Sequence, residues 1–340
     1  MGSATFFDAF DALSLAFVLP VLVRQWGISP VEIGWLIAIG YLGQFVGALC
    51  FGGLAERYGR VPSAAGATAL MSVMSLACAL AGNLPVLLAL RLVQGIGVGG
   101  EMPVAAVYIN ELSKAHGRGR FFLLYEMIFP VGLMITGQVG ALVVPTLGWQ
   151  VMFLIGGIPG LVIAALLLRL RESPRWLIGQ GRLSEAEAII GEIEDSVKDT
   201  NSQVGLRDRR DLRGSRDRTR WAELLSPLYR GRTAVVWTLW ACAYFITNGL
   251  NNWMPTLYSS VYGLSLQQAL RAGTLNNVAQ VVILLGCAFA IDRIGRRRWT
   301  AASFVTGAVF LMFAGAGVVG ALAATKMLET RNRRLEDLAP

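Results

Sequence analysis

Long apolar stretches separated by short polar turns run through most of this chain. Each stretch is near or above the roughly 20 residues that a helix needs to cross the hydrocarbon core of a bilayer. Six stretches precede a long polar segment and three follow it. The sequence therefore predicts membrane spans at residues 4–24, 31–55, 62–82, 85–112, 121–145, 149–170, 233–260, 268–291 and 299–323.

Composition supports a membrane protein. Hydrophobic residues make up 54% of the chain and charged residues 15%, whereas charged residues are about 25% of an ordinary soluble domain. The formal net charge of +8 could indicate nucleic-acid binding, but the basic residues lie between apolar runs, where they set membrane orientation. We therefore expect a lipid bilayer as the surroundings and no nucleic-acid partner.

Enzyme and metal motifs are missing from the sequence. It contains neither His-Glu-x-x-His nor Gly-x-Ser-x-Gly and has a single histidine. The four cysteines lie inside apolar segments without paired spacing. We expect no enzymatic activity, no metal and no cofactor.

The basic residues also predict orientation and domains. They gather in the even-numbered connections between spans, and Arg24 lies in an odd-numbered one. Because Lys and Arg favour the cytoplasmic side, we expect an inner (plasma) membrane protein with a cytoplasmic N-terminus. The expected parts are a six-helix N-terminal half at 1–170, a cytoplasmic linker at 171–232, a partial C-terminal half at 233–323 and a polar tail at 324–340.

Two different segments are expected within the linker. Ser184 and Glu187 have the spacing of a capping box, which predicts an amphipathic helix that begins there and runs through Ile193. Residues 198–220 interleave Arg and Asp with almost nothing apolar, so we expect this stretch to be disordered.

Two charged turns repeat one pattern of an acid, Arg, any residue, Gly and Arg, which indicates a duplicated membrane protein. The first turn resembles the loop signature Gly-x-Leu-x-Asp-Arg-x-Gly-Arg of the major facilitator superfamily, with Glu56 in place of Asp. The resemblance implies an all-α bundle, alternating access between two halves, and turns that lock the cytoplasmic face in the outward-open state. A solvated loop is the alternative. The turn residues are Gly53, Glu56, Arg57, Gly59 and Arg60, then Asp292, Arg293, Gly295 and Arg296.

Further motifs narrow the resemblance. Residues 171–177, Arg-Glu-Ser-Pro-Arg-Trp-Leu, resemble a signature that follows the sixth span in sugar porters. Asp8 and Asp11 resemble the first-span Asp-x-x-Asp of aromatic acid/proton symporters, where these acids matter for transport. The family pattern is six plus six spans, so the three spans after the linker indicate a truncated or frameshifted relative. We expect it to be a monomer.

The first span carries both of these carboxylates. A three-residue separation places Asp8 and Asp11 on one helix face. An ionisable residue at the centre of a span costs roughly 2.5–3.5 kcal/mol on insertion scales, which favours a functional role. The alternative is that the helix begins later and both acids lie at the interface.

The fourth span combines a cation with glycines. Arg91, Gly95, Gly97 and Gly99 resemble the superfamily motif Arg-x-x-x-Gly-x-Gly-x-Gly, and small residues at this spacing allow close helix approach. Arg91 stays protonated and needs an anion at depth. Asp11, Glu101, Glu126 or a substrate carboxylate could serve, and a static structural ion pair is the alternative.

These residues suggest proton-coupled symport. Burial disfavours a charged carboxylate and a nearby Arg favours it, so an anionic substrate that competes with Asp11 for Arg91 would promote protonation. We predict transport of an aromatic or other carboxylic acid. The alternatives are sugar or polyol symport with protons, or a truncated membrane protein that transports nothing. Polar residues expected to line the substrate cavity, or else to bridge helices, are Gln44, Gln138, Asn248, Asn252, Asn276 and Gln280.

Overall fold

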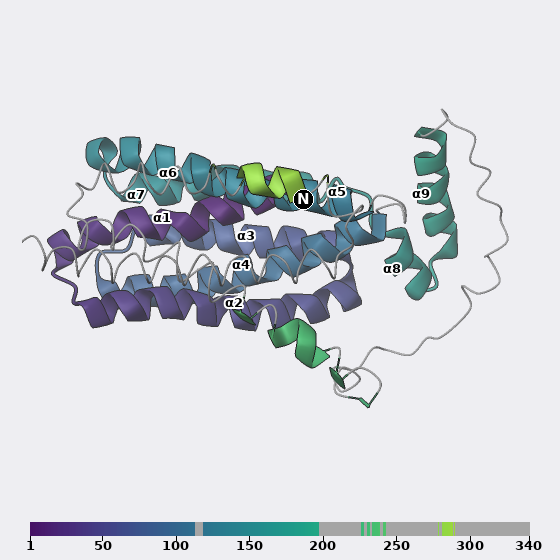
Figure 1. Ribbon diagram of the computed structural model, residues 1–340, viewed down its shortest axis with the longest axis horizontal. Coiled ribbons are helices and arrows are strands. Elements are labelled where there is room, and N and C mark those ends of the chain that lie inside the picture. Colours follow the sequence, from purple (N-terminus) through teal and green to yellow (C-terminus); the bar gives the residue numbers. More distant parts are fainter. Residues whose placement is uncertain are drawn as a thin grey trace, which may run out of the picture. The chain divides into compact units, whose positions relative to one another are not determined.

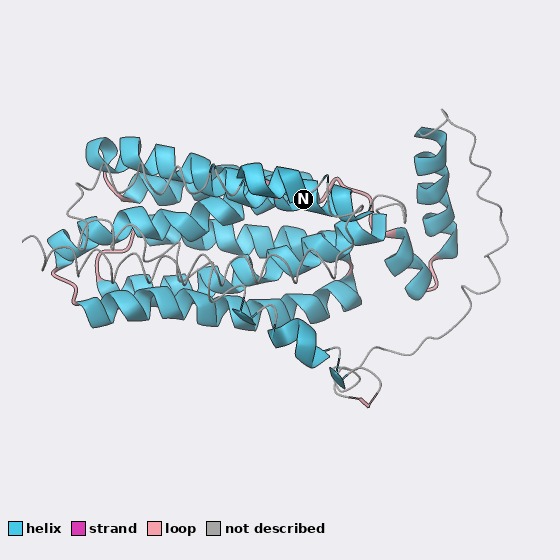
Figure 2. Ribbon diagram, viewed as in Figure 1, coloured by secondary structure: helices cyan, strands magenta, loops and turns pink. Residues whose placement is uncertain are grey.

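The computed structural model describes residues 1–112 and 118–196, together with the short stretches 226–227, 230–231, 233–238, 241–242, 278, 281–287 and 289. The described residues form helices joined by short connections and include no strand (Figure 2). The chain divides into two compact units, Met1–Leu285 and Gly286–Pro340, and the helices below belong to the first. The predicted all-α fold is confirmed.

Within the described residues, six segments are long and apolar enough to cross a membrane, and they correspond to the first six predicted spans. The predicted disorder at 198–220, the second charged turn and the tail lie outside the described residues. The helices of the first unit (Figure 1) are α1 Gly2–Trp26, α2 Pro30–Tyr58, α3 Arg60–Ala79, α4 Leu84–Leu112, α5 Arg118–Glu126, α6 Ile128–Leu147, α7 Gln150–Leu167, α8 Pro174–Gly179 and α9 Leu183–Ser196.

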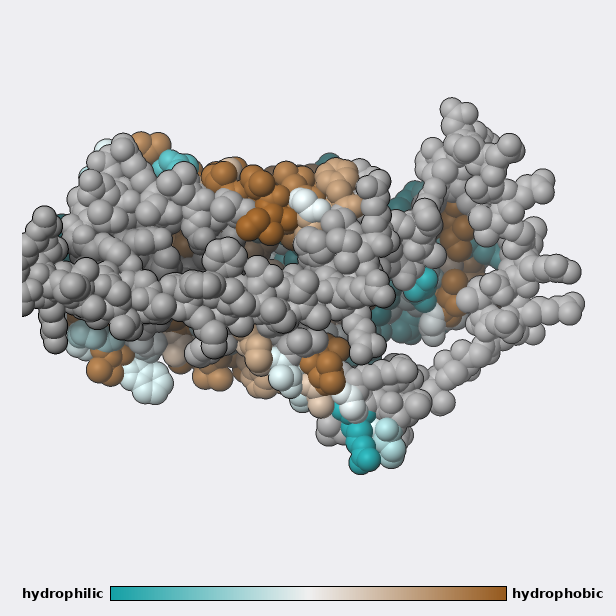
Figure 3. Space-filling model, in the orientation of Figure 1, coloured by the Kyte–Doolittle hydropathy of each residue, from teal (hydrophilic) through white to brown (hydrophobic). Residues whose placement is uncertain are grey.

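Large apolar side chains cover much of the outer surface of these helices. Trp35 is 62% exposed, Phe45 64% and Leu142 71%. Hydrophobic side chains gather along the upper and lower edges of the face shown in Figure 3. Exposed apolar area on this scale is unusual for a water-soluble monomer and suits contact with lipid.

The fifth predicted span is divided. A turn at Met127 separates α5 from α6, whereas the sequence predicted one continuous helix over 121–145. Pro130 explains the break, because it has no N–H to donate to the carbonyl of Glu126 and its ring would clash with that carbonyl. Glu126 is therefore the last residue of α5.

The helix start predicted within the linker differs from the structure. The capping box expected at Ser184 is wrong, because α9 begins at Leu183 and Ser184 lies inside its first turn. Arg182 and Glu185 stabilise this turn with hydrogen bonds of 2.7 and 2.6 Å, which also raise the pKa of Arg182. The capping box lies instead at the start of α2, where Ser29 and Glu32 bond each other's backbone N–H groups.

Glycines bring α4 against α2 and α3 at backbone distance. A Cβ added to Gly43 of α2 would lie 3.0 Å from the Cα of Gly95, and one added to Gly97 would lie 2.8 Å from the carbonyl oxygen of Ala67 in α3. The close approach predicted from Gly95 and Gly99 is confirmed. The matching glycines of α2 follow a similar spacing that could have been recognised in the sequence; they are Gly40, Gly43 and Gly47.

An apolar core fixes α1 in this bundle and thereby sets the position of its acidic face. Phe10, next to Asp11 in sequence, is 2% exposed and belongs to the same cluster as Leu87 of α4 and Phe153 of α7. Trp149 packs edge-on against Phe153, with ring centroids 5.9 Å apart. The packing of Phe10 in this cluster thus fixes the turn of α1 on which Asp11 lies.

Candidate functional site

The linker contacts the first charged turn through Glu172. Its carboxylate accepts hydrogen bonds from the backbone N–H groups of Arg60 (3.0 Å) and Val61 (3.1 Å) at the start of α3. An anion is favoured at a helix N-terminus, where these N–H groups have no partner within the helix. Gly59 has φ +113°, and a side chain here would also meet the Glu172 carboxylate. Both backbone conformation and space therefore require glycine at this position.

The same linker segment also caps the preceding helix. Trp176 donates its ring N–H to the carbonyl of Glu56 at 2.9 Å, and the Gln180 amide donates to the same oxygen at 3.2 Å. This carbonyl lies in the last turn of α2, where the helix itself supplies no donor. The linker thus bridges the end of α2 and the start of α3.

The side chains of the predicted gate lie apart from one another. Arg60 forms an ion pair with Glu111 of α4, with its Nη2 atom 3.2 Å from the carboxylate. Glu56 and Gly53 are exposed, and Arg57 lies over the Tyr58 ring at 5.3 Å. The role of these residues as a lock stays a prediction, because the second turn lies outside the described residues.

We expect Glu172→Gln to lower the free energy of unfolding by about 1 kcal/mol, since the amide loses the charge that favours a helix N-terminus and one of two acceptor oxygens. Thermal unfolding in detergent measures the change. Glu187→Gln on α9, an exposed position, is the control. An equal unfolding temperature for both variants would refute the capping role.

The buried polar site lies between α1, α3 and α4. Arg91 donates from Nη1 to Asp11 Oδ2 at 3.2 Å and to Gln94 Oε1 at 2.8 Å. Gln94 donates to Asp11 Oδ1 at 2.5 Å, and Ser75 donates to the same oxygen at 3.3 Å. The side chains of Arg91 and Asp11 are 9% and 4% exposed. The ion pair is therefore enclosed, with hydrogen bonds to both carboxylate oxygens.

The sequence offered several possible anionic partners for Arg91, and the structure shows which of them it contacts. Asp11 is its ion-pair partner among the described residues. Glu101 instead bonds Thr5 on α1, with the hydroxyl 3.2 Å from Oε1. The later helix start considered for the first span is wrong, because α1 begins at Gly2, and Asp8 is 1% exposed within the bundle.

Two polar residues of this site were missed by sequence reasoning. Gln94 lies three residues after Arg91, a spacing that places both on one helix face and could have identified it. Ser75 comes from α3, where several small polar residues occur, and nothing in the sequence distinguishes it from Ser72.

A cavity of about 430 Å³ opens beside the ion pair. Asp8, Arg91 and Gln44 supply its polar lining. Asp8 Oδ1 and Arg91 Nε are buried without a hydrogen-bond partner in the part of the chain that the structure describes. Of the two first-span acids, Asp11 pairs with Arg91, whereas Asp8 forms no ion pair among the described residues. The larger apolar side chains of the wall are Tyr41, Phe45, Met102 and Phe129.

A second polar cluster lies where α1, α4 and α5 meet. Glu101 is fully buried and accepts a hydrogen bond from Thr5, whose hydroxyl is 2.6 Å from that of Tyr125. Glu101 Oε2 has no hydrogen-bond partner within the described ranges. Glu126 follows Tyr125 and is half-buried. Neither Glu101 nor Glu126 is among the residues that line the cavity.

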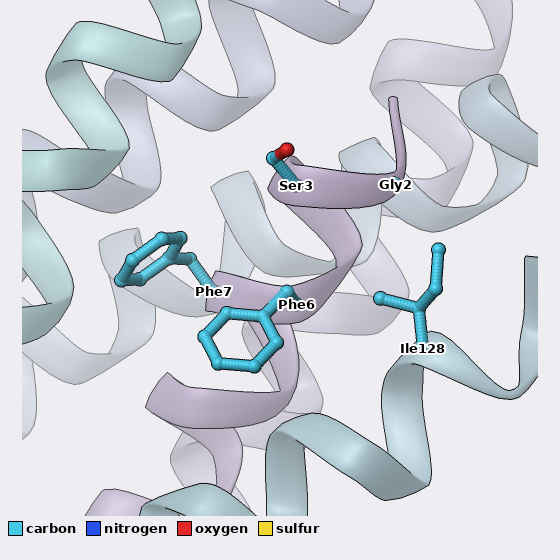
Figure 4. A pocket seen from close by; sticks show the side chains of 5 residues that line it. All are labelled: Gly2, Ser3, Phe6, Phe7 and Ile128. Atoms are coloured by element: carbon cyan, nitrogen blue, oxygen red, sulfur yellow. The ribbon is translucent and has the colours of Figure 1, made fainter.

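An open hollow of about 470 Å³ lies between α1 and α6. Figure 4 shows it bordered by the rings of Phe6 and Phe7, the side chain of Ile128 and the first residues of the chain, Gly2 and Ser3. It has no charged side chain. The cavity beside Arg91 is therefore the better candidate for binding an ion or polar solute.

The remaining predicted site residues have these positions. Gln44 lines the cavity, as predicted. Gln138 is on the exposed surface of α6 and is not among the lining residues. The residues outside the described part of the chain, for which the roles stay predictions, are Asn248, Asn252, Asn276, Gln280, Asp292, Arg293, Gly295 and Arg296.

A bundle of helices that are long and apolar enough to cross a membrane, with a buried ion pair beside a polar cavity, is typical of a membrane transport protein. The Major Facilitator Superfamily model matches residues 1–328, and this chain belongs to that family. It is therefore a multi-pass inner-membrane protein of a family that transports small molecules, and the resemblance found in the sequence is confirmed.

Relatives of known name cover most of the chain. It is 33% identical over 307 residues to the niacin transporter NiaP of Acinetobacter baylyi, and the alignment covers 90% of this chain and 68% of that protein. It is 30% identical over 314 residues to the 4-hydroxybenzoate transporter PcaK of Pseudomonas aeruginosa, covering 91% and 69%. The chain thus spans about two thirds of the length of these relatives.

The fold is similar to that of a solved transporter. The partially occluded inward-open xylose transporter XylE from E. coli aligns with a TM-score of 0.68 and 21% sequence identity, covering 87% of this chain and 70% of that one. At this identity the similarity concerns the fold alone.

Proposed function

We propose that this protein carries a small aromatic carboxylic acid into the cell together with protons, by alternating access. The cavity beside Arg91 is the binding site, and the chain works as a monomer in the lipid bilayer with its N-terminus in the cytoplasm. The observation that carries the proposal is the Arg91 guanidinium, which lines an aromatic-walled cavity with its Nε unpartnered.

The lining chemistry suits an aromatic carboxylate. A guanidinium binds a carboxylate with two parallel hydrogen bonds, and Arg91 has both the charge and an unpartnered N–H for such a contact. The rings of Tyr41, Phe45 and Phe129 offer surfaces against which an aromatic substrate can pack. NiaP and PcaK are named for niacin and 4-hydroxybenzoate, which are both aromatic carboxylic acids.

Proton and substrate transport are coupled because Asp11 and the substrate carboxylate compete for the Arg91 guanidinium. When a substrate carboxylate binds Arg91, Asp11 loses its ion-pair partner while it remains enclosed by protein. A buried carboxylate without a cation is strongly disfavoured as an anion, so Asp11 takes up a proton from the cavity. Substrate and proton therefore move together, and their release lets Arg91 and Asp11 pair again.

Uptake into proteoliposomes tests this function. We expect labelled nicotinate or 4-hydroxybenzoate to accumulate when the outside is more acidic, and a protonophore to abolish the accumulation. Nicotinamide, which has the ring without the carboxylate, is the matched control, and xylose tests the sugar alternative suggested by residues 171–177. Accumulation of xylose but of neither acid, or none of any solute, would refute the proposal.

A further inference from the structure

We propose that Asp8 and Glu101 together bind one proton, at a site separate from the Asp11–Arg91 ion pair. This site goes beyond the proposed function, in which Asp11 carries the coupled proton. Asp8 is 1% exposed and Glu101 is fully buried, on two helices that pack together. Among the described residues, Asp8 Oδ1 and Glu101 Oε2 both lack a hydrogen-bond partner. A protonated carboxyl supplies the donor that this arrangement lacks.

The charges around the pair favour a shared proton. Asp8 lies one turn of α1 beyond Thr5, whose hydroxyl donates to Glu101, so negative charge on Glu101, like that on Asp11, disfavours an ionised Asp8. Arg91 uses Nη1 for Asp11 and Gln94, and its one ion pair among the described residues is with Asp11. Two neighbouring buried carboxylates, neither of which forms an ion pair with a side chain among the described residues, cannot both stay ionised at low cost.

The other titratable groups that face the pair lie at the start of the chain and on α5. Next to α1 is the α-amino group of Met1, which attracts Glu101. From α5, Tyr125 and Glu126 add a hydroxyl and a further negative charge. The described helices α6 and α7 also pack against α1, and they contain no Asp, Glu, Lys, Arg or His.

The two acids have different access to water. Asp8 lines the cavity, so a proton can reach it from water there, whereas Glu101 is enclosed. Thr5 donates to Glu101 Oε1, which leaves Oε2 as the oxygen that can carry the proton. The step transfers a proton from cavity water to a carboxylate oxygen and changes no other bond.

Infrared spectroscopy of the wild-type chain at neutral pH tests the site without any variant. Only carboxyl groups in unusual surroundings stay protonated at this pH, and they give a C=O stretching band. The full chain is made with ¹³C at the side-chain carboxyl of Asp in one sample and of Glu in another. A shared proton predicts that each label shifts part of this band. A band that shifts with one label alone, or no band at all, would overturn the proposal.

Two isosteric variants assign the band to residues. In the ¹³C-labelled samples, Asp8→Asn is expected to change the intensity assigned to Glu, and Glu101→Gln the intensity assigned to Asp, since one proton is no longer divided between the two acids. Glu32→Gln, at a partly exposed position in the first turn of α2, is the matched control and should leave the band unchanged. An unchanged contribution from the remaining acid in both variants would contradict sharing. No substrate is used, so this result and the uptake result can fail independently.

Discussion

Arg91→Met is expected to abolish proton-driven uptake of the aromatic acid and to lower the free energy of unfolding by about 3–5 kcal/mol. Uptake is lost because the substrate carboxylate no longer has the Arg91 guanidinium to bind. The free energy of unfolding falls because Asp11, 4% exposed, is left buried with no cation. Uptake into proteoliposomes and thermal unfolding in detergent measure the two effects on the same preparation.

The double variant Arg91→Met/Asp11→Asn separates a functional ion pair from a static one. Removing both charges takes away the unpaired anion, so we expect most of the lost stability to return. Uptake should stay absent, because neither the substrate site nor the coupled carboxylate is present. Full uptake by the double variant would show that the Arg91–Asp11 pair serves packing alone.

Gly97→Val is expected to prevent correct packing of α4 against α3. Its Cβ would lie 2.5 Å from the backbone nitrogen of Met71 and 2.8 Å from the carbonyl oxygen of Ala67, and backbone atoms within a helix cannot move aside singly. Overpacking typically costs about 1–3 kcal/mol, and contact with backbone places this site at the upper end or beyond. The folded fraction on size exclusion and the thermal midpoint measure the effect.

Gly52→Val is the matched control for this substitution. Gly52 lies in α2, and an added Cβ there meets nothing within 4 Å. Both substitutions replace glycine with valine inside a helix, so the change in helix propensity is the same for both. The difference between their thermal midpoints therefore measures the effect of the close approach between α3 and α4. Similar midpoints for the two variants would mean that α3 and α4 are not packed at backbone distance.

Charged residues within apolar stretches made much of the site recognisable in advance. Asp8, Asp11 and Arg91 are conspicuous because an ionisable group in a span is costly and rarely without a role. Uncharged polar residues carry no such signal. Gln44 lines the cavity and Gln138 lies on an exposed face, although the sequence offered the same reason for both.

The contacts of the linker also could not be predicted from the sequence. Residues 171–177 were recognised by their resemblance to a known signature, but the resemblance does not say what they contact. The structure places the Glu172 carboxylate on the first N–H groups of α3 and the Trp176 ring on the last turn of α2. These contacts join residues more than one hundred positions apart, which no local pattern can specify.

The sequence by itself determined the class of protein, the six spans of the described bundle and the identity of the ionisable residues inside them. These properties depend on hydropathy and spacing along one helix, which are local. Only the tertiary structure decided that Arg91 pairs with Asp11 and that Asp8 and Glu101 have no ion-pair partner among the described residues. Pairing depends on how α1 and α4 rotate and cross, and that is set by the glycines and apolar core that pack them.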